Sequence, residues 1–381
     1  MQTVITRARI RMLFPGMLAL SSVWPVAVCG AATAATPLVY ITDLYHSPGD
    51  PDDHVDLATL LALPEFDVRA ILIDIRPPRP PDASPYDPGF IPIGQLCYLT
   101  GRSFPVAVGP AEALHSLYDA AVDRPESEQA AIRLLLSVLR ESREKVLVNT
   151  VGTCRIIAAA FLREPQLLRD KVKAVVVNAG SSGKGPLEHN VKVDLLSYVI
   201  VMRSGLPVLW FPCASSGTGW GSPESSGPNN TFYRVPHREL FANLPAPLRN
   251  WFAYALDRSN RADVLRALTE PVEHRADSPL NRGERYLWST ASFVLTGGRT
   301  LARTAEGWRF VPPGSVPANA DVEAMTLVPI DFSITDAGQP TWSKAAGASP
   351  IRLFQRTPGP RHTAAMAEAL NALLRAFPAV R

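Results

Sequence analysis

The sequence predicts an α/β fold with an open, mostly parallel sheet and helices on both of its faces. Continuous apolar runs rich in Val, Leu and Ile recur along the 381 residues, and stretches with helical periodicity separate them. Such runs are typical of strands that are buried on both faces, which occur mainly in parallel sheets. No internal repeat and no convincing linker interrupts the chain. We therefore predict one domain over residues 36–381, with a core at about 38–300 and a C-terminal elaboration at about 300–381.

Six strands are predicted in the first part of the chain. The first is Leu38–Thr42, and the others lie, in order, at 66–74, 104–109, 145–151, 173–180 and 207–212. Helical patterns begin near His54 and cover 126–142 and 155–161. Because a strand, a helix and a further strand in this order form a βαβ unit, the strands are expected to pair in parallel.

The second part of the chain has a different character. Helical stretches are predicted at 238–241, 247–256 and 261–268, followed by short strands after Gly297 and a closing amphipathic helix at 363–377. A proline-rich loop is predicted between the second and third strands, at 75–92. It follows a strand end, so we expect it on the same edge of the sheet as the loop after the first strand.

The N-terminus has the pattern of an export signal. Arg7, Arg9 and Arg11 form a basic region, an apolar stretch covers 12–28, and small residues at 31–35 supply a cleavage site. We predict a signal peptide at 1–35 and a mature protein that is periplasmic or extracellular, with no stable membrane insertion after cleavage.

Charge and cysteine content limit the partners. Removal of residues 1–35 would leave as many basic as acidic residues, which argues against a nucleic acid or an anionic membrane as partner. Cys97, Cys154 and Cys213 would remain, and an odd number leaves at least one free thiol. The sequence leaves a homo-oligomer open.

The loop between the first strand and the first helix is unusually acidic. It contains Asp43, Asp50, Asp52 and Asp53 within eleven residues. Strand-to-helix loops are where open α/β sheets bind ligands. A single Asp there would be read as an ordinary helix cap. Because crowded carboxylates repel one another unless a cation or hydrogen-bond donors offset the repulsion, four of them predict a hard-cation or acid/base site.

Two other segments attract attention. The glycine-rich loop Gly180–Gly185 fails the test for a phosphate-binding P-loop, because Gly185 follows Lys184 where Ser or Thr is required, so a plain turn is predicted. The sequence has no G-x-S-x-G motif and gives no support to a serine hydrolase. Glu188-His189-Asn190 would, taken alone, be a solvated turn.

Taken in order, these segments resemble the nucleoside hydrolase family, in particular its exported and divergent relatives. Pro48–Asp53 resembles the end of the family's D-x-D-P-G-x-D-D loop, and Val177–Gly180 resembles its M-G-G strand end. Glu188–Asn190 resembles its E-x-N segment. Val148–Arg155 and Ser204–Val208 resemble two further steps, the V-G-P-L-T-N turn and S-G-L-P-V. The resemblance covers about residues 38–212.

The resemblance implies a calcium-dependent enzyme that cleaves ribonucleosides or related ribosyl compounds with a metal-bound water. Calcium (Ca2+) would be held by Asp53, by Asp43 or Asp50 or both, and by the carbonyl of Val151. Asp43 or Asp50 would be the general base, and the resemblance does not decide between them. The residues expected to bind ribose are Asp52, Glu188, Asn190 and Asn178.

One departure from the family keeps a second hypothesis open. The family's late His-Asp pair has no clear match, and the nearest segment by order, Tyr286–Thr290, contains no carboxylate. The alternatives are a non-catalytic, calcium-dependent sugar- or nucleoside-binding protein of the cell envelope and a cell-surface module that calcium only stiffens.

Overall fold

The computed structural model describes residues 34–46, 51–77, 87–215, 227–257, 259, 261–270 and 278–380. The chain divides into two compact units, Met1–Ala34 and Ala35–Arg381, and the description below concerns the second. Nearly all of the predicted signal peptide and the whole of 47–50, which includes Asp50, lie outside the described residues. The signal peptide and the domain boundaries therefore stay predictions.

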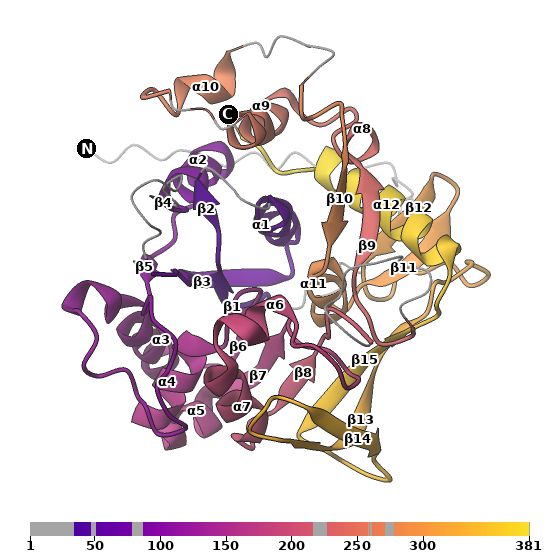
Figure 1. The fold of residues 1–381 in the computed structure, drawn as a ribbon. Coiled ribbons are helices and arrows are strands. Elements are labelled where there is room, and N and C mark those ends of the chain that lie inside the picture. Colours follow the sequence, from indigo (N-terminus) through magenta and orange to yellow (C-terminus); the bar gives the residue numbers. More distant parts are fainter. Residues whose placement is uncertain are drawn as a thin grey trace, which may run out of the picture. The chain divides into compact units, whose positions relative to one another are not determined.

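A nine-stranded sheet forms the centre of this unit (Figure 1). Seven neighbouring strands are parallel, and β13 pairs antiparallel with both of its neighbours. The predicted open, mostly parallel sheet is thus confirmed. In spatial order the strands are β14 (Pro340–Lys344), β13 (Met325–Ile334), β15 (Ile351–Arg356), β8 (Val208–Trp210), β7 (Val172–Val177), β6 (Val146–Thr150), β1 (Thr36–Thr42), β3 (Phe66–Ile73) and β5 (Val106–Val108).

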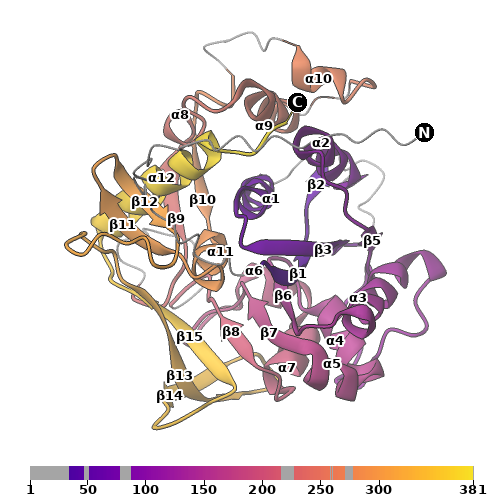
Figure 2. The ribbon, with the colours of Figure 1, turned by 180° about the vertical axis from the view of Figure 1, so that it is seen from behind.

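Helices cover both faces of the sheet, as predicted (Figure 2). Side chains of β1 alternate between two cores: Leu38 and Tyr40 join one, Val39 and Ile41 the other. The first core includes α1 (Asp52–Ala62), α2 (Phe90–Thr100), α9 (Ala246–Leu256), α11 (Thr290–Thr296) and α12 (Pro360–Arg375). The second includes α3 (Ala130–Glu141), α4 (Arg155–Arg163), α5 (Pro165–Lys171) and α7 (Leu195–Arg203).

Shorter elements complete the unit. They are β2 (Tyr45–His46), β4 (Asp87–Pro88), the 3₁₀ helix η1 (Glu126–Glu128), α6 (His189–Val193), β9 (Tyr233–Pro236), α8 (His237–Leu240), α10 (Arg266–Thr269), β10 (Glu284–Leu287), β11 (Thr300–Thr304) and β12 (Gly307–Val311). Strand β2 pairs antiparallel with β4, so the end of the predicted proline-rich loop lies beside the start of the acidic loop. In the described part of the chain, Cys97, Cys154 and Cys213 are free thiols, and no helix is both long and apolar enough to cross a membrane.

Two predicted segments differ from the structure. Helix α2 begins inside the segment predicted to be a proline-rich loop, and Pro92 fits because it lies in the first helical turn. Only Arg266–Thr269 of the predicted helix 261–268 is helical. Near the C-terminus, β13, β14 and β15 extend the main sheet beside β8, which was not predicted. Pairing between strands so distant in sequence leaves no local signal.

The strand order places a topological switch at β1 and β6. From β1 the chain crosses through α1 to β3, and from β5 it returns through α3 to β6 on the other side of β1. The segments that follow β1 and β6 therefore lead to α1 and α4, which pack on opposite faces of the sheet. Open α/β sheets bind their ligands at such a point.

A candidate active site at the carboxyl ends of the central strands

Asp43 and Gly152 lie next to each other at the switch point. Asp43 follows β1 directly, and the backbone N–H of Val151, just after β6, donates to the carbonyl of Ile41 at 2.9 Å. A Cβ atom on Gly152 would lie 3.3 Å from Oδ1 of Asp43 and 2.9 Å from Oδ2 of Asp74. Glycine is required here because the backbone after β6 passes over two carboxylates with no room for a side chain.

The carboxylate of Asp43 is half-buried and paired with an arginine. Nη2 of Arg76 lies 3.0 Å from Oδ2 of Asp43. Burial raises the pKa of Asp43 to about 6, Arg76 opposes this rise, and the neighbouring carboxylate of Asp74 adds to it. Asp43 can therefore exchange a proton near neutral pH, which is the property of a general base.

A buried arginine holds the loops around Asp43. Oδ2 of Asp74 accepts the backbone N–H of Thr153 at 2.7 Å, and its Oδ1 lies 3.6 Å from Nη1 of Arg155. Nε of Arg155 donates to Asp194 at 2.8 Å. Nη1 of Arg155 also donates to the backbone carbonyls of Ile75, Pro110 and Ala111, at 3.0, 2.7 and 2.8 Å. One fully buried guanidinium thus joins the segments that follow β3, β5 and β6.

Asp52 and Asp53 occupy the first turn of α1. The N-cap of this helix is Pro51, with no side-chain cap hydrogen bond, so neither aspartate is the ordinary cap that was weighed as an alternative. The hydroxyl of Thr42 donates to Oδ1 of Asp53 at 2.7 Å, which ties the helix start to the end of β1. The N-terminal end of the helix dipole favours negative charge at both positions.

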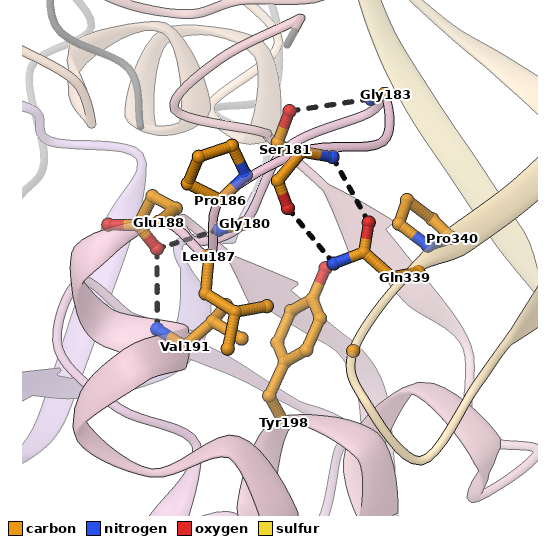
Figure 3. Close-up of a pocket in the computed structure, with 12 residues that line it drawn as sticks. Gly180, Ser181, Gly183, Pro186, Leu187, Glu188, Val191, Tyr198, Gln339 and Pro340 are labelled. Carbon is orange, nitrogen blue, oxygen red and sulfur yellow. Dashed lines mark hydrogen bonds between the residues drawn. The ribbon is translucent and has the colours of Figure 1, made fainter. Parts of the chain in front are cut away.

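The Glu188–Asn190 segment reaches the same place from the other side. Nδ2 of Asn190 donates to the carbonyl of Val151 at 2.9 Å. Glu188 is the N-cap of α6 and accepts the backbone N–H groups of Gly180, Asn190 and Val191, two of which Figure 3 shows. Burial raises the pKa of Glu188, while these three N–H groups oppose the rise. A short helix forms here instead of the solvated turn that this segment, taken alone, would suggest.

Asn178 directly follows β7 and lies beside a second asparagine. Its Nδ2 donates to Oδ1 of Asn149 at 2.8 Å and to the carbonyl of Thr150 at 2.9 Å. Its Oδ1 is buried and has no hydrogen-bond partner within the described ranges. Nδ2 of Asn149 approaches the hydroxyl of Ser292, in α11, at 3.5 Å. A buried acceptor without a partner is costly, so a ligand donor at this point would be favourable.

A small pocket lies beside Glu188, between the glycine-rich loop and the turn that joins β13 to β14 (Figure 3). Gln339 binds both backbone groups of Gly185: Oε1 accepts its N–H at 3.1 Å and Nε2 donates to its carbonyl at 3.0 Å. Nε1 of Trp342 donates to the carbonyl of Ser182 at 2.7 Å. The C-terminal hairpin therefore supports the loop that carries Glu188.

The described residues do not by themselves fit a calcium ion. They include no group of three or more His, Cys, Asp or Glu side chains that could hold a metal. Oδ2 of Asp43 is paired with Arg76, and the carbonyl of Val151 accepts a hydrogen bond from Asn190. Because Asp50 lies outside the described ranges, the calcium site of Asp43, Asp50, Asp53 and Val151 stays a prediction that depends on Asp50.

The segment Tyr286–Thr290 contains hydroxyl groups and no carboxylate. Strand β10 ends at Leu287 and α11 begins at Thr290. The hydroxyls of Thr290 and Tyr233 are 2.9 Å apart, and Ser292 lies next to Asn149 as described above.

Sequence reasoning missed four residues of this site: Asp74, Arg76, Asn149 and Arg155. Asp74 lay at the end of the predicted strand 66–74 and Arg76 two residues beyond it, so the rule that selected Asp43 would have selected them too. Asn149 lay within the predicted strand 145–151 and was not predicted as a site residue. Nothing in the sequence indicates that Arg155 is fully buried.

Comparison with solved structures identifies the fold. A plant nucleoside hydrolase superposes with a TM-score of 0.53 at 14% identity, covering 91% of this chain and 99% of the plant enzyme. A purine-preferring ribonucleoside hydrolase from Gardnerella vaginalis superposes with a TM-score of 0.50 at 13% identity, covering 89% and 99% of the two chains.

Sequence comparison gives relatives over part of the chain. The pyrimidine-specific ribonucleoside hydrolase RihA of Citrobacter koseri is 28% identical over 198 residues, and that of Escherichia coli O127:H6 is 27% identical over 180. The match covers 46% of this chain and 59% of the Citrobacter protein, and 42% and 55% in the second case. No family model matches the sequence. In fold, and in the part of its sequence that these relatives cover, this chain is nucleoside hydrolase-like.

Proposed function

We propose that this protein is a hydrolase that cleaves the N-glycosidic bond of ribonucleosides or related ribosyl compounds. One observation carries the proposal. The acidic loop after β1 and the Glu188–Asn190 segment are far apart in sequence, yet both meet the Val151–Gly152 backbone at the switch point. Similarity to ribonucleoside hydrolases in sequence and in fold supports the same reaction.

The chemistry of the reaction suits these residues. Cleavage of a glycosidic bond passes through an oxocarbenium-like state, which negative charge beside the sugar stabilises. Asp43 would take a proton from the attacking water, and its raised pKa makes it a stronger base than an ordinary aspartate. Asp52, Glu188 and Asn190 would hold the ribose hydroxyls. The unpartnered Oδ1 of Asn178 would accept a hydrogen bond from the same ligand.

The family resemblance implies calcium as a cofactor, but the described residues do not fit the ion by themselves. When bound, such an ion would lower the pKa of a bound water and orient the sugar. The proposal of N-glycoside hydrolysis does not depend on the ion, because the described residues do not complete a site for it.

The nucleobase is a separate question. The sequence relatives are named as pyrimidine-specific and one fold neighbour as purine-preferring, so both classes of nucleoside belong in the assay.

Export through the predicted signal peptide is part of the proposal. An N-terminal sequence of the mature protein that begins near residue 36 would support it, and retention of residues 1–35 would contradict it.

A non-catalytic nucleoside- or sugar-binding protein is the second candidate. The observation that favours it is the segment Trp288–Thr290, which offers hydroxyls where a late carboxylate would be expected. Turnover distinguishes the two candidates: the hydrolase releases free ribose and nucleobase, whereas the binding protein only retains the ligand.

The substitution Asn190→Ala tests the ribose-binding role. It removes one polar contact to the sugar and the hydrogen bond that fixes the carbonyl of Val151. We expect kcat/KM for ribose release from uridine or inosine to fall by about 10- to 100-fold, which corresponds to one hydrogen bond in a buried site. Initial rates, measured with a reducing-sugar assay, give the answer.

Asn371→Ala is the matched control for Asn190→Ala. Nδ2 of Asn371, in α12, also donates to backbone carbonyls, those of Leu240 and Ala242, but it lies outside the site. Its kcat/KM should equal that of the wild type. If wild type, Asn190→Ala and Asn371→Ala have equal kcat/KM, Asn190 does not bind the ribose.

The pKa of Asp43 predicts a pH profile. A general base acts in its ionised form, and the folded protein raises the pKa of this carboxyl to about 6. We therefore expect kcat/KM to be constant above pH 7 and to fall about tenfold for each pH unit below 6. A profile that stays flat down to pH 4.5 would show that the base has an ordinary pKa and is not Asp43.

A further inference from the structure

Two arginines, Arg76 and Arg155, lie close to the carboxylates that follow β1 and β3, and their environments differ. Arg155 is buried, and its Nε and Nη1 are occupied by Asp194 and three backbone carbonyls. Arg76 pairs with Asp43 at 3.0 Å, and its side chain is 34% exposed. Arg76 is therefore the described cation that can act on Asp43.

The sheet itself fixes this pair. Strands β1 and β3 are parallel neighbours, and the backbone N–H of Asp74 donates to the carbonyl of Thr42 at 2.8 Å. Asp43 and Arg76 follow these two strand ends by one and three residues, so their ion pair joins the ends of adjacent strands. Such a placement holds the guanidinium in one geometry on the carboxylate.

Arg76 occupies the oxygen of Asp43 that a divalent ion would need. Its Nη2 lies 3.0 Å from Oδ2, while Oδ1 lies on the side of Gly152. The carbonyl of Val151, the backbone ligand that the resemblance implies, accepts a hydrogen bond from Asn190. Among the described residues, no group of three or more His, Cys, Asp or Glu side chains could hold a metal.

We propose that Arg76 takes the place on Asp43 that a divalent cation would take, so that the guanidinium holds and orients this carboxylate without a metal. Arg76 is then a positioning residue: it acts through Asp43 and leaves Oδ1, on the Gly152 side, to the reaction. The role of Asp43 in turnover rests on the proposed function, whereas the competition between Arg76 and a divalent ion does not.

Cation binding without substrate tests the proposal. The probes are Ca²⁺ by calorimetry and Tb³⁺ by luminescence, applied to the mature wild-type protein and to Arg76→Met and Arg76→Lys. Wild type and Arg76→Lys should show no saturable binding up to about 1 mM, the weak end of protein calcium sites. Arg76→Met, which exposes Asp43, should bind at least about tenfold more tightly than wild type.

The matched control for these variants is Arg203→Met. Arg203 pairs with Asp336 at 2.7 Å and is similarly exposed, but it lies in α7 away from the acidic loop. This variant should behave as wild type. Circular dichroism and thermal midpoints establish that all variants are folded. Tight binding by the wild type, or identical behaviour of wild type and Arg76→Met, would overturn the proposal.

An activity measurement separates this inference from the proposed function. Wild-type ribose release should be unchanged by EDTA, and Arg76→Met should shift the acid limb of its pH profile upward while Arg76→Lys restores it. Loss of wild-type turnover in EDTA would overturn the role of Arg76. If no variant releases ribose under any condition, the hydrolase proposal fails. The cation-binding result still decides whether Arg76 or a divalent ion pairs with the carboxylate of Asp43.

Discussion

Replacement of Asp43 with Asn is expected to lower kcat/KM for ribose release by about 10²- to 10⁴-fold, the usual contribution of a general base. The amide has nearly the same shape as the carboxylate and can still accept a hydrogen bond from Arg76, but it cannot take a proton from water. Because burial disfavours the ionised form of Asp43, removal of its charge should not lower the free energy of unfolding. Initial rates with uridine and inosine, together with urea unfolding midpoints, measure both effects.

The control for Asp43→Asn is Asp336→Asn. Asp336 also pairs with an arginine, Arg203, but on the surface. Its kcat/KM should stay within about twofold of wild type, since exposed ion pairs contribute little. If Asp43→Asn retains more than a tenth of wild-type activity, the base is not Asp43. Asp50, which the sequence left as the alternative, would then be the residue to replace.

The parts of the site that could be predicted are those with a local signal. Apolar runs mark β1, β6 and β7, and polar residues at their ends project to one edge of a parallel sheet. That rule is enough to bring Asp43, Val151 and Asn178 to the same edge of the sheet. The contact of Asn190 with Val151 follows from the same order of segments.

The parts that could not be predicted depend on contacts between distant segments. Arg155 opens a helix with an ordinary amphipathic pattern, and only the folded chain shows that its guanidinium is surrounded by carbonyls and acids. The pairing of β15 with β8 has no counterpart in local periodicity. Gln339 supports the loop of Glu188 only because that pairing carries the C-terminal hairpin across the sheet.

The second large effect concerns stability. Arg155→Met should lower the free energy of unfolding by about 3–5 kcal/mol. It leaves Asp194 and Asp74 buried without their cation, and three backbone carbonyls lose their hydrogen-bond donor. Arg155→Lys should also destabilise the protein, since one ammonium group cannot reach acceptors that a planar guanidinium spans. Urea unfolding followed by tryptophan fluorescence measures both changes.

Arg140→Met is the control for Arg155→Met. Arg140 is an exposed arginine of α3 that pairs with Glu164, and its loss should leave the urea midpoint unchanged. A stability of Arg155→Met equal to wild type would mean that the acids around it are protonated or solvated when the arginine is absent. The substitution Arg155→Met should also disturb the candidate active site. Arg155 and Asp74 hold the Thr153 backbone, and this backbone carries Gly152 against Asp43, so a folded Arg155 variant with normal turnover would show that the carboxylate needs no such support.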